Sequence, residues 1–168
     1  ELSIKVDAQR KNFFEKIINK NKLNVGLVWS GFIHGSGQPY RSIQLKNFEK
    51  ILSLDANFFC LQNEVWENDL VYFKQSKINN YGHLNFKDIT ALIENLDLII
   101  TVDTSFLHLA SSLNKKTWAL LCIDPDWRWG ELNKINPYSS IKLFIQKKFN
   151  NWDNVLDNVY NQMKLMIK

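Results

Sequence analysis

Cysteine is scarce in this 168-residue sequence, which has only Cys60 and Cys122, and neither belongs to a CxxC pair. Both lie in apolar runs, so we expect reduced, buried thiols in a cytoplasmic protein rather than a disulfide or a metal site. The three histidines are not spaced as metal ligands either. The sequence therefore predicts no bound metal.

Long hydrophobic runs are also missing. No apolar stretch approaches the ~20 residues of a membrane-spanning helix, and the N-terminus lacks the apolar core of a signal peptide, so we expect no transmembrane segment. The net charge of +4 comes from scattered lysines rather than from a dense basic patch, so nucleic acid is not an expected partner. The sequence opens on Glu1 rather than Met, and we expect it to be part of a longer protein.

What the sequence does contain is a regular alternation of strand and helix patterns. Its length and its 45% hydrophobic content predict a single domain, residues 1–168. Buried strands are predicted at 24–29, 57–61, 98–102, 117–123 and 141–145, with 78–84 as an ambiguous sixth. Helices are predicted within 1–22 (a leading helix), 45–54, 66–77, 88–96 and 151–168 (a closing helix). This order predicts an α/β fold, a three-layer Rossmann-like sandwich with a mainly parallel sheet.

The segment 96–123 is the clearest unit in the chain, because it reads strand, turn, helix, strand. Asp103, Thr104 and Ser105 follow a β-branched run directly and are residue types that begin helices. A strand, helix and neighbouring strand in this order form a parallel βαβ unit. Ligands bind beyond the carboxyl ends of such strands, and the turn offers N–H groups and hydroxyls suited to a phosphate. The alternative is that Asp103 or Thr104 only caps the helix, and the pattern leaves both open.

Two loops carry further candidates. The glycine-containing loop 30–42 follows the first strand and could approach a phosphate, although it has no GxGxxG or Walker pattern. Its one cation, Arg41, can pair with an anion or remain a solvated loop residue. The loop 124–138 carries Trp127, Arg128 and Trp129. Its tryptophans argue against disorder and can either stack on a sugar or base or attach the loop to the domain.

Five stretches now point to one family: GLVWSG at 26–31, RSI at 41–43, CLQ at 60–62, DITALIENLDLIITVDTSFLHLA at 88–110 and PDWRW at 125–129. In this order they resemble the C-terminal domain of glycosyltransferases of the heptosyltransferase type (family 9). The bacterial branch in which this domain follows tetratricopeptide repeats is the most similar, and the resemblance covers nearly the whole chain. It implies the C-terminal half of a GT-B fold, which binds a nucleotide sugar. An N-terminal domain, outside this chain, would hold the acceptor and usually the catalytic base.

The resemblance also implies roles for individual residues. Donor-binding positions are Ser30, Gly31, Arg41, Gln62, Glu64, Asp103, Thr104, Ser105 and His108. Sugar or loop contacts are expected from His34, Trp127 and Arg128. No catalytic residue and no cofactor is expected in this chain, so the isolated domain should bind a nucleoside diphosphate sugar without turnover. A helix N-terminus, hydroxyls and one arginine can stabilise the leaving diphosphate without a metal. His108 fits a core position equally well.

Two other functions remain open. Gln44 replaces a proline common in the family, and Ser105 stands where heptosyltransferases often carry glycine. Such departures favour a degenerate, non-catalytic domain that serves as a scaffold or interaction module. The second alternative is an epimerase of the related two-domain fold, for which the sequence shows no matching carboxylate and histidine spacing.

Overall fold

The sheet of this protein is entirely parallel among the described residues. The computed structural model describes residues 4–31, 39–126, 129 and 139–167. The strand order is β2-β1-β3-β4-β5, with β1 at Leu23–Val28, β2 at Ala56–Cys60, β3 at Leu98–Val102, β4 at Thr117–Leu121 and β5 at Ile141–Ile145. The predicted α/β class and parallel sheet are confirmed. The ambiguous segment 78–84 contributes only a single bridge, between Phe59 and Asn79.

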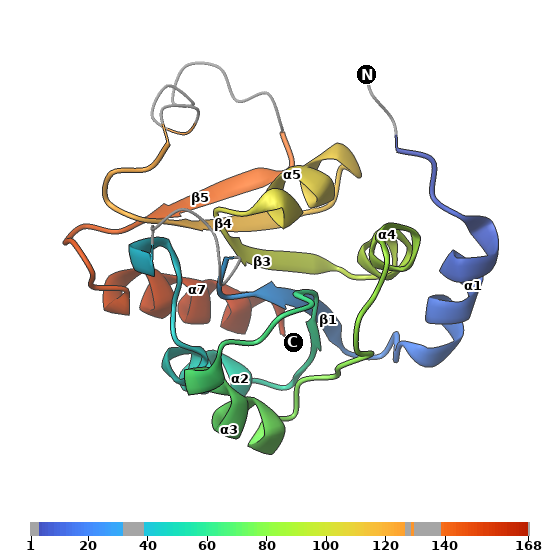
Figure 1. Cartoon of the computed structure of the whole chain (residues 1–168), viewed down its shortest axis with the longest axis horizontal. Coiled ribbons are helices and arrows are strands. Elements are labelled where there is room, and N and C mark those ends of the chain that lie inside the picture. Colours follow the sequence, from blue (N-terminus) through green and yellow to red (C-terminus); the bar gives the residue numbers. More distant parts are fainter. Residues whose placement is uncertain (1–3, 32–38, 127–128, 130–138, 168) are drawn as a thin grey trace.

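Helices cover both faces of the sheet, which gives the predicted three layers (Figure 1). One face carries α1 (Ala8–Ile17), α4 (Phe86–Glu94) and α5 (Ser105–Ser112). The other carries the 3₁₀ turn η2 (Leu45–Phe48), α2 (Glu49–Leu52), α3 (Glu67–Gln75) and α7 (Asp153–Met166). A second 3₁₀ turn, η1 (Pro39–Arg41), precedes η2. No helix in the described ranges combines the length and apolarity that crossing a membrane requires.

Local sequence signals explain where several helices begin and end. The side chain of Asp7 accepts a hydrogen bond from the Arg10 N–H at 3.1 Å and so caps α1. Asn85 caps α4 in the same way through the Asp88 N–H. Asn114 follows α5 with a φ of 54°, the left-handed conformation that asparagine tolerates at a helix end. The helix predicted over 45–54 begins instead as the 3₁₀ turn η2 and ends at Leu52.

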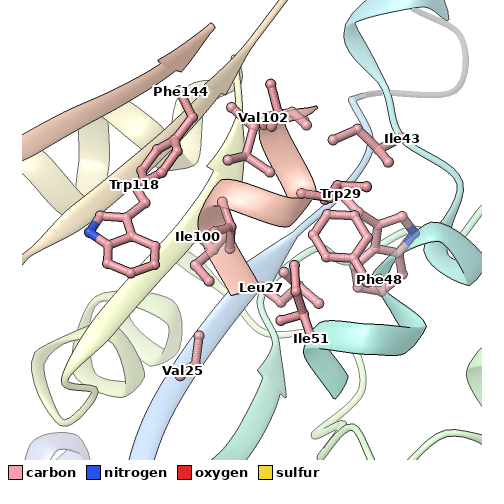
Figure 2. Close-up of a cluster of buried hydrophobic side chains, with 14 of the residues drawn as sticks. Val25, Leu27, Trp29, Ile43, Phe48, Ile51, Ile100, Val102, Trp118 and Phe144 are labelled. Carbon is pink, nitrogen blue, oxygen red and sulfur yellow. The ribbon is translucent and has the colours of Figure 1, made fainter. Parts of the chain in front are cut away.

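Alternate residues of the strands feed two different cores. Leu27 and Trp29 point to the face covered by α2 and α7, whereas Val28 lies in the core under α1 and α4. Figure 2 shows the first of these cores, with Trp29 near Ile43. Two cores in one sheet hold the carboxyl ends of the strands in place, and these ends carry the candidate site.

Gly26 in β1 explains how closely the second core is packed. A Cβ atom on this residue would lie 2.6 Å from Cδ1 of Leu61 and 2.8 Å from Cδ1 of Ile99. These distances are shorter than real contacts, so any side chain at this position would have to displace the ends of Leu61 and Ile99.

Candidate functional site

A pocket of about 300 Å³ opens at the carboxyl ends of β1, β2 and β3, where ligands bind in parallel α/β sheets. We call it the edge pocket. Its lining is Ser30, Gly31, Gln62, Asn63, Glu64, His83, Thr104, Ser105 and Phe106. Six of the nine predicted donor-binding residues belong to this lining. Three stretches that are far apart in the sequence therefore meet at one place.

Gln62 is the central hydrogen-bonding group of this edge. Its Oε1 accepts the N–H groups of Trp29 at 3.0 Å and Ser30 at 3.3 Å. Its Nε2 donates to Ser30 Oγ at 2.8 Å and to the Glu64 carbonyl at 2.7 Å. The side chain is 7% exposed, so these bonds form away from water. Gln62 therefore joins the ends of β1 and β2 as well as lining the pocket.

The peptide groups of Gly31 are held from two sides. The Gly31 N–H donates to Ser42 Oγ at 3.1 Å, and the Gly31 carbonyl accepts from Trp66 Nε1 at 3.1 Å. Below them, Asp69 is 4% exposed and accepts from Trp29 Nε1 at 3.0 Å and from the Leu45 N–H at 2.9 Å. The backbone at the start of the first loop is therefore fixed by Trp66, the N-cap residue of α3, and by Ser42, between η1 and η2.

The N-terminus of α5 faces the edge pocket through Thr104 and Ser105. Thr104 is the N-cap residue, but its side chain makes no capping hydrogen bond; its Oγ1 lies 3.3 Å from Thr101 Oγ1 instead. The first N–H groups of a helix have no partner within the helix. The alternative in which Thr104 only caps the helix does not match this geometry, and the turn keeps its capacity to bind an anion.

Arg41 and Asp103 meet beside this turn. Arg41 Nη1 lies 3.2 Å from Asp103 Oδ2, and the two side chains are 24% and 9% exposed. Within the part of the chain that the structure describes, the buried Nε of Arg41 has no hydrogen-bond partner. The pair places a guanidinium near the α5 turn with donor capacity left over.

His108 takes a different position from the other predicted residues. Its ring stacks on Trp129, with 5.5 Å between the centroids and 22° between the planes. Trp129 is 3% exposed and packs with Leu107 and Leu121. Like Arg41 and Asp103, His108 is absent from the described lining of the edge pocket. The predicted contacts His34, Trp127 and Arg128 lie outside the described residues.

Three lining residues were not predicted from the sequence: Asn63, His83 and Phe106. Asn63 binds the backbone of Leu84 twice, through Nδ2 to its carbonyl and Oδ1 to its N–H, each at 3.0 Å. These bonds bring His83 to the pocket although it lies in the ambiguous segment. The only sequence signal was the position of Asn63 directly after a strand end.

The far end of the same edge carries a second buried glutamine. Gln146 follows β5, is 3% exposed, and accepts the Ile123 N–H at 3.2 Å through Oε1. Its Nε2 is buried and has no hydrogen-bond partner among the described residues. A buried donor without a partner is uncommon in folded proteins, so this end of the edge also has donor capacity left over.

Both cysteines are free and buried, as predicted. Burial raises the pKa of the Cys60 thiol to about 12, and its Sγ donates to the Gln62 carbonyl at 3.3 Å. Burial also raises the pKa of Cys122, against an opposing effect of the Arg41 charge. The described residues contain no group of three or more His, Cys, Asp or Glu side chains that could hold a metal ion.

Solved structures share this fold along almost the whole chain. A family 9 glycosyltransferase from Veillonella parvula matches with a TM-score of 0.61 and 14% identity, over 99% of this chain and 47% of its own. E. coli ADP-heptose LPS heptosyltransferase II matches with a TM-score of 0.57 and 11% identity, over 96% of this chain and 54% of its own. The UDP-GlcNAc 2-epimerase of Methanocaldococcus jannaschii matches with a TM-score of 0.54 and 15% identity, over 91% of this chain and 42% of its own. This chain thus spans about half the length of the structures it matches.

Sequence comparison separates the glycosyltransferases from the epimerase, which fold likeness alone does not. Curated proteins give no significant match. The model of glycosyltransferase family 9 (heptosyltransferase) matches residues 63–154, which is more than half of the chain and includes the α5 turn. The chain belongs to glycosyltransferase family 9 (heptosyltransferase).

Proposed function

We propose that this chain is the donor-binding half of a metal-independent glycosyltransferase. It binds a nucleoside diphosphate sugar in the edge pocket, and the sugar passes to an acceptor held by an N-terminal domain outside this chain. The observation that most supports this proposal is the meeting of Ser30, Gln62 and Thr104 around the N-terminus of α5. Residues from three strand ends, rather than a single capping motif, form the pocket.

The chemistry of the site suits a diphosphate leaving group. When the sugar bond breaks, negative charge develops on the leaving phosphate oxygens. N–H groups at a helix N-terminus, the hydroxyls of Thr104 and Ser105, and the Arg41 guanidinium can each donate to such oxygens. Fixed donors stabilise developing charge well because they need not reorganise during the reaction. Gly31, whose N–H and carbonyl are both hydrogen-bonded, lines the same pocket.

The expected binding orientation follows from the positions of these groups. The diphosphate would lie between the α5 turn and Arg41. The nucleoside would extend toward Glu64 and His83, which also line the pocket. No catalytic base has been assigned to this chain, so we propose that it binds the donor without catalysing sugar transfer.

Calorimetric titration with ADP, UDP and GDP tests the proposal. We expect one of the three to bind, and the double variant Thr104→Ala, Arg41→Ala to bind it at least about tenfold more weakly, which is about 1.4 kcal/mol. Asn158→Ala, an exposed change on α7, is the matched control and should leave affinity unchanged. Sugar transfer by the 168-residue chain alone would contradict the proposal that this chain only binds the donor.

One observation favours the alternative of a non-catalytic interaction module. Asp103 neutralises Arg41 at 3.2 Å, so a diphosphate would have to compete with a carboxylate for this cation. A folded chain that binds no nucleotide, either alone or joined to its N-terminal domain, would support the module and exclude the donor site.

A further inference from the structure

A second and larger pocket, of about 440 Å³, lies beside the edge pocket. The two share a wall: Trp66 and Ser42 line the second pocket, and both hydrogen-bond to Gly31, which lines the first. The volume falls within the range of small-molecule sites, about 300–1,000 Å³. We call this second site the amide pocket, because amide side chains dominate its rim.

Four amides around this pocket are uncommitted. The side chains of Gln44, Asn47, Asn68 and Asn150 line it, and none of them forms a hydrogen bond with a described residue. They come from η2, α3 and the loop before α7, so four separate backbone positions present free amides to one hollow. Each amide offers two donors and a carbonyl acceptor.

The charge of the lining argues against an anionic ligand. No Lys, Arg or His is among the described lining residues, so an anion would find no cation there. Of its two carboxylates, Asp69 is buried and already accepts hydrogen bonds from Trp29 and Leu45. Only Asp153 remains exposed. A neutral ligand that both donates and accepts hydrogen bonds matches these groups.

The inner wall of the pocket is apolar. It contains Ile43 and two tryptophans, Trp66 and Trp152. Tryptophan combines a large apolar surface with one N–H donor, and the Nε1 of Trp152 is buried without a hydrogen-bond partner in the described structure. An apolar wall with a polar rim fits a molecule that has one face of C–H groups and hydroxyls around its edge.

From these contacts we infer that the amide pocket is a second binding site, for a neutral saccharide of mono- or disaccharide size. Sugar hydroxyls both donate and accept, as the four free amides do, and the C–H face of a sugar ring can rest against the indole wall. The inference stands on this pocket alone. It is independent of whether the edge pocket binds a nucleotide.

Nuclear magnetic resonance can test this site directly. The probes are the methyl glycosides of glucose, galactose and N-acetylglucosamine, together with maltose. We expect at least one probe to receive saturation from the protein and to shift the side-chain amide signals of Gln44, Asn47, Asn68 and Asn150. The dispersed spectrum of the same sample reports that the chain is folded.

Three variants assign the binding to the pocket. Asn68→Ala removes one amide, and Asn150→Gly removes another while keeping a residue that tolerates the observed φ of 53°. Each variant should lower the affinity for the sugar about fivefold, as expected for one lost hydrogen bond. The affinities for ADP, UDP and GDP should be unchanged. The control Asn158→Ala should bind the sugar normally. The inference is overturned if a folded chain shows no saturation transfer to any probe. It is also overturned if the two pocket variants bind the sugar as tightly as the control does.

Discussion

Two glutamines at opposite ends of the sheet edge show how position alone fails to define a role. Gln62 and Gln146 each follow a strand, are each buried, and each accept a backbone N–H from a neighbouring strand end. The Nε2 of Gln62 donates two hydrogen bonds, whereas that of Gln146 has no partner among the described residues. The β1–β2 half of the edge is therefore a satisfied scaffold. The β3–β5 half, with Arg41 and Gln146, retains unused donors.

The largest effect should come from the scaffold half. Asp69→Ala is expected to lower the free energy of unfolding by about 3 kcal/mol, because Trp29 Nε1 and the Leu45 N–H would be buried without an acceptor. Urea denaturation measures this change. Asp157→Ala is the matched control: its carboxylate is 58% exposed and pairs with Lys50 on the surface, so its loss should cost less than about 1 kcal/mol. Equal losses in the two variants would contradict the scaffold.

The same substitution at both glutamines tests the comparison most directly. Gln62→Leu should lower the free energy of unfolding by about 2 kcal/mol, because two buried N–H groups lose their acceptor. Gln146→Leu should cost less than about 1 kcal/mol, because it removes one accepted bond and also one buried donor without a partner. Thermal and urea unfolding of both variants would decide. A larger loss of stability in Gln146→Leu than in Gln62→Leu would contradict the assignment of the β1–β2 half as the scaffold.

Alkaline pH should destabilise the scaffold half through Cys60. Its pKa is raised to about 12 in the folded chain, against about 8.5 for an unfolded cysteine. Between these values the folded state keeps a proton that the unfolded state has released, so stability falls as pH rises, by up to about 1.4 kcal/mol per pH unit. Cys60→Ala should flatten the stability profile above pH 9. An unchanged slope in this variant would show that Cys60 does not cause the alkaline loss.

The smallest effect is expected at Thr104. A threonine that caps a helix usually contributes about 1 kcal/mol, but this side chain makes no capping bond. Thr104→Ala should therefore change the free energy of unfolding by less than about 0.5 kcal/mol. A loss of 1 kcal/mol or more in urea denaturation would restore the structural capping role that the sequence left open.

The sequence was sufficient for the elements because their signals are local. β-branched runs such as 98–102 predicted strands, and Asp103, Thr104 and Ser105 predicted the start of a helix, since each residue type favours its conformation without help from distant parts. Boundaries were less accurate where tertiary packing intervened. The first turn of the segment 45–54 is a 3₁₀ turn, held by the bond from the Leu45 N–H to Asp69.

The candidate site was predicted less completely because it depends on contacts between distant segments. Residues beyond strand ends could be named from the sequence, and six of them meet in the edge pocket. Nothing local to Gln62 shows that both ends of its amide are occupied, and nothing local to His83 shows that Asn63 holds its neighbour. Asp69 reads in sequence as an ordinary acidic residue in the first turn of a helix. Its two buried partners come from residues 24 and 40 positions away.

The strand order also has a consequence for how this chain is made. β1 pairs with β2 on one side and with β3 on the other, and β3 is synthesised long after β2. Once residues up to Cys60 have left the ribosome, β1 can pair with β2, but the second edge of β1 stays open until Val102 has also emerged. An open strand edge can pair with other chains, and parallel contacts far apart in sequence form slowly. The interval in which residues 61–97 emerge is therefore the one in which the growing protein most needs shielding from its neighbours.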